Sequence, residues 1–146
     1  MSNVDLKDEL LFLFSENIKY LKNLNTLYLD KNLLEKKDSM QSLIESLIKL
    51  KHFAHLSLAN NNVKNCLKEI SYLINNSNTL KNIDLSGNQI ENVDALIIKK
   101  CNLAHLNLSN NLMADKGIMQ FLNWLKNNSL INHVYLSNNN SRIFFK

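Results

Sequence analysis

A repeated phrase constrains this chain more than any other feature of its sequence. Residues 54–61 read AHLSLANN and residues 104–111 read AHLNLSNN. Both belong to a longer frame, leucine-x-x-leucine-x-leucine-x-x-asparagine, in which Phe, Ile or Val can replace a leucine. The frame occurs in five successive copies, at Leu24–Asn32, Phe53–Asn61, Leu80–Asn88, Leu103–Asn111 and Ile131–Asn139. Copy starts lie 29, 27, 23 and 28 residues apart, a spacing typical of an array built from one supersecondary unit.

The letters of the frame predict a short strand followed by a turn. Leu56, Ser57 and Leu58 alternate between apolar and polar, as does a strand with one buried face. The closing asparagine comes where the chain leaves the strand, and its amide can hydrogen-bond turn groups that would otherwise be unpaired in the interior. Stacked copies would align these residues into an asparagine ladder, comprising Asn32, Asn61, Asn88, Asn111 and Asn139.

The frame resembles the leucine-rich repeat and extends over residues 24–139. The fourth copy, LAHLNLSNNLMADKGIMQFLNWLKNNSL, is similar to the ribonuclease-inhibitor type, in which a helix follows each strand. The resemblance implies an α/β fold, a right-handed solenoid with a parallel sheet on its concave face and helices on its convex face. We expect a single domain over residues 1–146, with an N-terminal helical cap at 1–23 and a C-terminal tail or cap at 140–146.

Helices are expected behind the strands. Asp38 or Ser39 would cap the helix of the first copy, and Asp115 would cap that of the fourth. The third copy leaves room for only about two helical turns, around residues 93–99. The inward faces of the full helices would carry Met40, Leu43, Leu47 and Leu50, then Cys66, Ile70, Leu73 and Ile74, then Ile118, Leu122 and Leu125.

Both ends of a solenoid need covers, because terminal repeats expose their core. A predicted amphipathic helix at residues 4–21 would cover the first repeat. Its inner face would carry Leu10, Phe14, Ile18 and Leu21. At the other end, the apolar residues 143–145 would fold back over the last layer. The alternative is that this C-terminal end pairs with a second copy of the chain as a homodimer.

Composition argues against several functional classes. The net charge is +4, but 16 of the 17 basic residues are lysines scattered over the predicted helices. Specific readers of bases and phosphates rely on arginine, so nucleic-acid binding is not expected. No apolar run is long enough to span a membrane, and the acidic N-terminus does not resemble a signal peptide. We expect a cytoplasmic protein, or one delivered into a host cytosol if it is an effector, with Cys66 and Cys101 as free core thiols.

The third, fifth and seventh positions of the frame would point outward from the sheet and form three columns. Histidine predominates in the third-position column, and tyrosine occurs twice in the fifth. Tyrosine and histidine present large contact areas with few rotamers to freeze, as interface anchors do. The predicted partner-binding residues are Tyr28, Asp30, His55, Ser57, Asn82, Asp84, His105, Asn107, His133 and Tyr135.

Catalytic and metal chemistry is not expected. His105 and His133 would lie on adjacent strands, about 5 Å apart. His55 would lie two strands away from His105, and a zinc site needs three or four converging ligands. No serine stands beside histidine and aspartate as a nucleophile, and no glycine-rich phosphate loop occurs.

The first functional hypothesis is therefore a non-enzymatic protein-interaction module without a cofactor, an effector or adaptor. Because histidines line the predicted face, its affinity for a partner should change between about pH 5 and 7. The resemblance also leaves an alternative open, a regulator of a small GTPase or a substrate-recognition component of a ubiquitin ligase.

Overall fold

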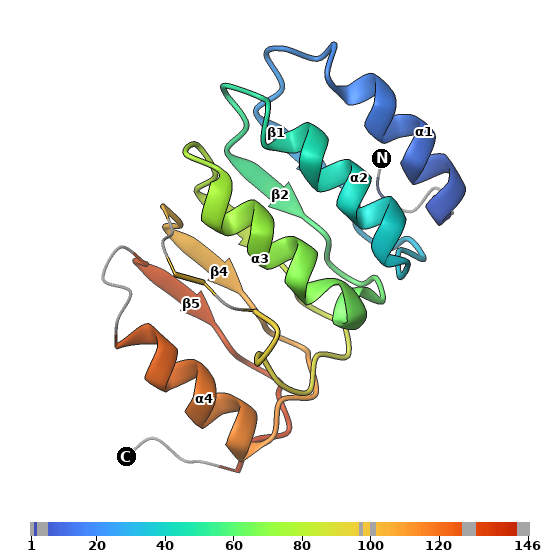
Figure 1. The fold of residues 1–146 in the computed structure, drawn as a ribbon. Coiled ribbons are helices and arrows are strands. Elements are labelled where there is room, and N and C mark those ends of the chain that lie inside the picture. The colour runs from blue at the N-terminus through green and yellow to red at the C-terminus, as the bar shows by residue number, and fades with distance from the viewer. Residues whose placement is uncertain (1, 3–5, 97, 100–101, 127–130, 143–146) are drawn as a thin grey trace.

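The computed structural model describes residue 2 and residues 6–96, 98–99, 102–126 and 131–142. It has an α/β fold in which each repeat opens with a short strand (Figure 1). The strands are β1 (Thr26–Tyr28), β2 (His55–Ser57), β3 (Asn82–Asp84), β4 (His105–Asn107) and β5 (His133–Tyr135). The helices are α1 (Asp8–Ile18), α2 (Lys37–Leu47), α3 (Leu67–Asn76) and α4 (Asp115–Leu125), with a 3-10 turn η1 (Val63–Cys66) before α3.

The strands form one parallel sheet in the order β1-β2-β3-β4-β5. Equivalent positions of the frame pair across each junction, so that Leu27 lies beside Leu56 and Leu56 beside Ile83. The same register continues from β3 through β4 to β5. The predicted parallel sheet is confirmed, and its register is that of the sequence repeat.

The helices lie in a row beside the sheet, from α1 at one end to α4 at the other (Figure 1). Their apolar faces and the alternate strand residues form one continuous hydrophobic cluster. Phe53, Leu58 and Leu73 within it are fully buried. Val134 and Leu136 of the last repeat are only partly buried against the cluster. The core is therefore less well covered in the last repeat than in the others.

The helical stripes of the first and second copies are buried as predicted, and in the fourth copy Ile118 is buried while Leu122 and Leu125 are partly so. The predicted side-chain caps are wrong. The N-cap residues Lys36 of α2 and Ala114 of α4 make no side-chain capping bond.

A side chain from another helix accepts hydrogen bonds at the N-terminus of α2. The buried Asp8 of α1 accepts the backbone N–H of Lys36 at 3.1 Å and the hydroxyl of Ser39 at 2.5 Å. A carboxylate there also interacts favourably with the helix dipole. Asp115, the first residue of α4, instead accepts the Ser141 hydroxyl and the Arg142 backbone N–H, both at 2.7 Å.

The inner face of α1 differs from the prediction. Leu11, Ser15 and Ile18 are buried and Phe14 is partly buried, whereas Leu10 and Leu21 are about half exposed. Every position from 10 to 14 is apolar, so spacing alone did not define the buried side. The contact of Asp8 with α2 defines the buried side of α1, because residues 8, 11, 15 and 18 share one side of a helix.

No helix follows β3 within residues 91–96 and 98–99, so the two turns expected around 93–99 are not formed there. The 23-residue spacing of this copy leaves too few residues for a helix. Val93, Leu96 and Ile98 still reach the core as irregular chain. α4 packs closely on this segment at Gly117, where an added Cβ would lie 2.7 Å from the Glu91 carbonyl oxygen.

The ladder asparagines connect each repeat to the one before it. The side-chain oxygen of Asn88 accepts the backbone N–H groups of Asn61 and Val63, both at 3.2 Å. Its side-chain NH2 donates to the carbonyls of Leu58 and Leu85, each at 3.0 Å. Asn32, Asn61, Asn111 and Asn139 make bonds of the same kind. These bonds pair backbone groups that the turn leaves without partners.

A second constraint of the turn was not anticipated from the frame. The residue before each ladder asparagine has a left-handed backbone, with φ between 54° and 68°. These residues are Lys31, Asn60, Gly87, Asn110 and Asn138. Asn and Gly tolerate this conformation best, which explains four of the five choices.

Candidate functional site

The open face of the sheet consists of the first and last residues of each strand, on the side opposite the buried middle residues. Thr26, Asn82 and His105 at its first positions are half-buried, and His133 is exposed. Tyr28 and Tyr135, at the last positions of the outer strands, are 50% and 48% exposed. The third- and fifth-position columns therefore lie on one face of the sheet, with an exposed tyrosine on each outer strand.

Ring contacts join neighbouring strands across the open face. Tyr28 of β1 packs against His55 of β2, with ring centroids 5.3 Å apart and the planes tilted by 50°. His105 of β4 stacks on His133 of β5 at 4.3 Å, with the planes only 12° apart. Stacked imidazoles present their faces to each other, so their nitrogens do not converge on a common point. These pairs hold the rings as a firm, preorganised surface.

Not every predicted binding residue is accessible. Ser57 is 4% exposed, so little of its surface is accessible to a partner. Its hydroxyl donates to Asp30, whose same oxygen accepts the Ala59 backbone N–H at 3.1 Å. Within the seventh-position column, Asp30 accepts the Ala59 N–H and the Ser137 hydroxyl donates to that of Ser109 at 3.1 Å, so these polar groups link neighbouring strands. Frame position alone could not distinguish this internal role from an external one.

A cavity of about 180 Å³ lies at the centre of the open face. Six predicted residues line it together with Ile83: His55, Asn82, Asp84, His105, Asn107 and Tyr135. Ile83 is the middle residue of β3 and is only 2% exposed. The Asp84 carboxylate accepts the Ser86 backbone N–H at 2.8 Å and the Asn107 side-chain NH2 at 3.0 Å.

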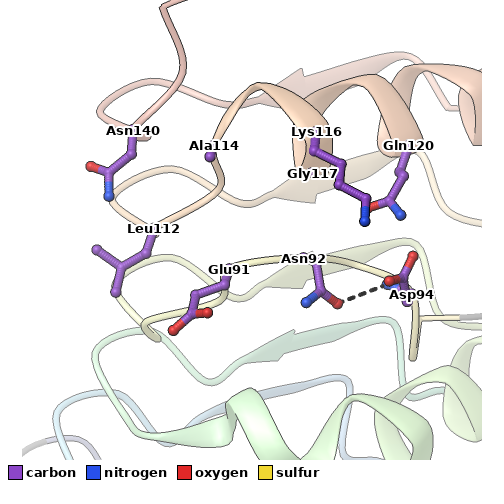
Figure 2. Close-up of a pocket in the computed structure, with 9 residues that line it drawn as sticks. All are labelled: Glu91, Asn92, Asp94, Leu112, Ala114, Lys116, Gly117, Gln120 and Asn140. Carbon is purple, nitrogen blue, oxygen red and sulfur yellow. Dashed lines mark hydrogen bonds between the residues drawn. The ribbon is translucent and has the colours of Figure 1, made fainter.

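A larger hollow, of about 390 Å³, lies on the helix side between the short third repeat and α4 (Figure 2). Glu91 and Asp94 lie along one wall, and Lys116 and Gln120 extend from α4 on the other. The Asp94 backbone N–H donates to the Asn92 side chain at 3.3 Å. This hollow follows from the missing helix of the third copy, and its lining lacks the ring pairs of the open face.

Among the described residues, no three His, Cys, Asp or Glu side chains converge as metal ligands. Cys66 is a buried free thiol, and burial, followed by the charge of Glu69, raises its pKa from 9.0 to about 12. Cys101 and the predicted tail cap at 143–145 lie outside the described residues. No helix in the described part of the chain is long and apolar enough to cross a membrane.

Comparison with known proteins supports the fold. No protein-family model matches the chain. No curated protein matches it in sequence. Among solved structures, the tropomodulin C-terminal domain of Caenorhabditis elegans is similar, with a TM-score of 0.68 over 90% of this chain and 83% of that one. The two sequences are 16% identical, so the likeness shows a shared parallel α/β fold and nothing about function.

Proposed function

We propose that this chain is a non-enzymatic protein-interaction module of the leucine-rich-repeat class, which binds a protein partner through the open face of its sheet. In this proposal the chain is a right-handed solenoid, with the sheet on its concave face and the helices on its convex face. The proposal also includes the cytoplasmic location expected from the sequence, with an effector or adaptor role there.

The observation that carries the proposal is the preorganised open face. Tyr28 and Tyr135 are about half exposed on the two outer strands, and ring contacts with His55 and between His105 and His133 restrict the side chains. Aromatic side chains that are already ordered lose little entropy on binding, which favours them as anchors. A parallel sheet normally has both faces covered, so an open face with aromatic anchors suits a protein ligand.

Affinity capture from cell lysate, followed by mass spectrometry, tests the proposal. The wild-type chain is compared with a Tyr28→Ala, His105→Ala, Tyr135→Ala triple variant. Each truncation of an anchor should weaken binding by about 1 kcal/mol or more, so proteins bound by this face should be lost from the triple variant. The unfolding midpoints of both chains are measured, to show that the loss is not due to unfolding.

Tyr72→Ala provides a matched control. Tyr72 lies on α3 and is 55% exposed, so this variant also removes an exposed tyrosine, but from the helix side. The control should capture the same proteins as the wild type. If the triple variant captures all of them and Tyr72→Ala does not, binding occurs through the helix side and the proposal is wrong.

A further inference from the structure

Asp84 places a negative charge at the centre of the open face. It is the last residue of β3, the middle strand of the sheet, and it is half-buried. No Lys, Arg or His nitrogen in the described part of the chain lies within 4.0 Å of its carboxylate. A carboxylate has about four acceptor positions, and the two bonds from Ser86 and Asn107 leave others unfilled.

The turn does not require this charge. The backbone N–H two residues after Asp84, that of Ser86, donates to the carboxylate at 2.8 Å. In the next repeat Asn107 occupies the same frame position, and its neutral amide oxygen accepts the Ser109 N–H at 3.0 Å. An asparagine therefore fulfils the same role in the turn. The charge of Asp84 is left available for a ligand.

The surroundings of Asp84 suit a single cationic side chain. The cavity above it is about 180 Å³, smaller than the roughly 300–1,000 Å³ of ordinary small-molecule pockets. His55, His105 and Tyr135 line the same cavity as Asp84. The Tyr135 ring can attract an Arg or Lys group that lies over its face, and the partly buried Asp84 carboxylate strengthens the preference for a cation.

We infer that this cavity accepts an arginine or lysine side chain of the protein partner, with its cationic group bound by Asp84 and its stem between the rings. The inference rests on the proposed function, because it takes the ligand to be part of a protein bound on the open face. Asp84 would select the partner by charge, while the outer tyrosines supply contact area.

Titrations followed by amide NMR test the inference with defined probes. N-acetyl-arginine amide and N-acetyl-lysine amide carry the cation, and N-acetyl-citrulline amide is a neutral match for arginine. The cationic probes should shift the amides of residues 82–84 and 105–107 in a saturable manner. Asp84→Asn, which keeps an acceptor for the Ser86 N–H, should weaken that binding about tenfold or more, as expected for loss of a charged hydrogen bond.

Asp30→Asn is the matched control. Asp30 also lies on this side of the sheet, but it does not line the cavity that contains Asp84, so the variant should bind the cationic probes as the wild type does. The inference is overturned if no probe gives saturable shifts, if the citrulline probe binds as well as arginine, or if Asp84→Asn leaves the titration unchanged.

Failure of this inference is distinguishable from failure of the proposed function. If Asp84→Asn still captures every partner that the Tyr28, His105 and Tyr135 triple variant loses, the open face binds protein without a basic anchor. The proposed function then stands and the inference is wrong. If the triple variant loses no partner while the arginine titration depends on Asp84, the cavity binds cations but the interaction surface lies elsewhere.

Discussion

Replacing Asn111 by leucine tests whether the asparagine ladder stabilises the fold. Asn111 is 3% exposed, so its hydrogen bonds form away from water. Its side-chain oxygen accepts the backbone N–H of Asn88 at 2.9 Å and that of Ile90 at 3.0 Å. Its NH2 group donates to three carbonyl oxygens of the neighbouring turns. Leucine is similar in size but can make none of these bonds.

The structure indicates which groups would be left unpaired. Each of the three carbonyl oxygens still accepts a hydrogen bond from another group. The Leu85 oxygen accepts from the Asn88 side chain, the Leu108 oxygen from the Asn139 side chain, and the Ser109 oxygen from the Gly87 backbone N–H. The N–H groups of Asn88 and Ile90 have no other described acceptor. A buried donor without a partner costs about 1–3 kcal/mol, so two cost about 2–6 kcal/mol. Leucine regains about 1–2 kcal/mol by its burial, which leaves an expected loss of about 2–3 kcal/mol at the middle of these ranges.

Urea unfolding followed by circular dichroism measures this loss. Variants with unchanged slopes are compared through their extrapolated free energies of unfolding. Asn139→Leu should cost only about 1 kcal/mol, because the half-buried Asn139 accepts a single N–H, that of Met113. Asn123→Leu, at an exposed position of α4, controls for the change in polarity and should stay within about 0.5 kcal/mol of wild type.

Two results would refute this reasoning: an Asn111→Leu chain as stable as the Asn123→Leu control, or equal losses for Asn111→Leu and Asn139→Leu. Asn110, although adjacent and exposed, is a poor control. Its φ of 55° is left-handed, so leucine there would add a backbone cost of about 1–2 kcal/mol that has nothing to do with the ladder.

Three further predictions concern single residues. Lys31→Asn should stabilise the fold by about 0.5–1 kcal/mol in thermal unfolding, because asparagine tolerates the φ of 55° at this position; Lys31→Gln should give no gain. Gly117→Ala should destabilise it by about 1–3 kcal/mol, opposite in sign to the usual gain in a helix, because the new Cβ would lie 2.7 Å from the Glu91 carbonyl oxygen. In a Cys101→Ser background, the Cys66 thiol should resist alkylation until the chain unfolds. The pKa of this thiol is raised from 9.0 to about 12 in the folded chain, so between these pH values the thiol ionises in the unfolded chain but not in the folded one. The contribution of Cys66 to stability should therefore be present below pH 9 and lost as the pH rises toward about 12.

The sequence by itself determined the sheet. Leucine at alternate positions sets the strands, and one asparagine per copy sets where each turn begins, so residues such as Leu56 and Asn88 follow from the period alone. The same period placed His55, Asp84 and His105 on one face. These features depend on local alternation and on a repeat that stacks in only one register. Both can be read from the order of residues along the chain.

Only the tertiary structure decided how the repeats join. Asp8 serves as a capping partner for α2, although 28 residues separate it from Lys36, and no local pattern links the two. Likewise, the buried Ser57 hydroxyl donates to Asp30 near the preceding strand. Position 117 needs glycine because the Glu91 carbonyl oxygen of the third repeat lies too close for a Cβ. Each depends on contacts between segments distant in sequence. The chain's pattern fixes which face a residue occupies, but its packed neighbours decide whether its polar atoms remain available to a ligand.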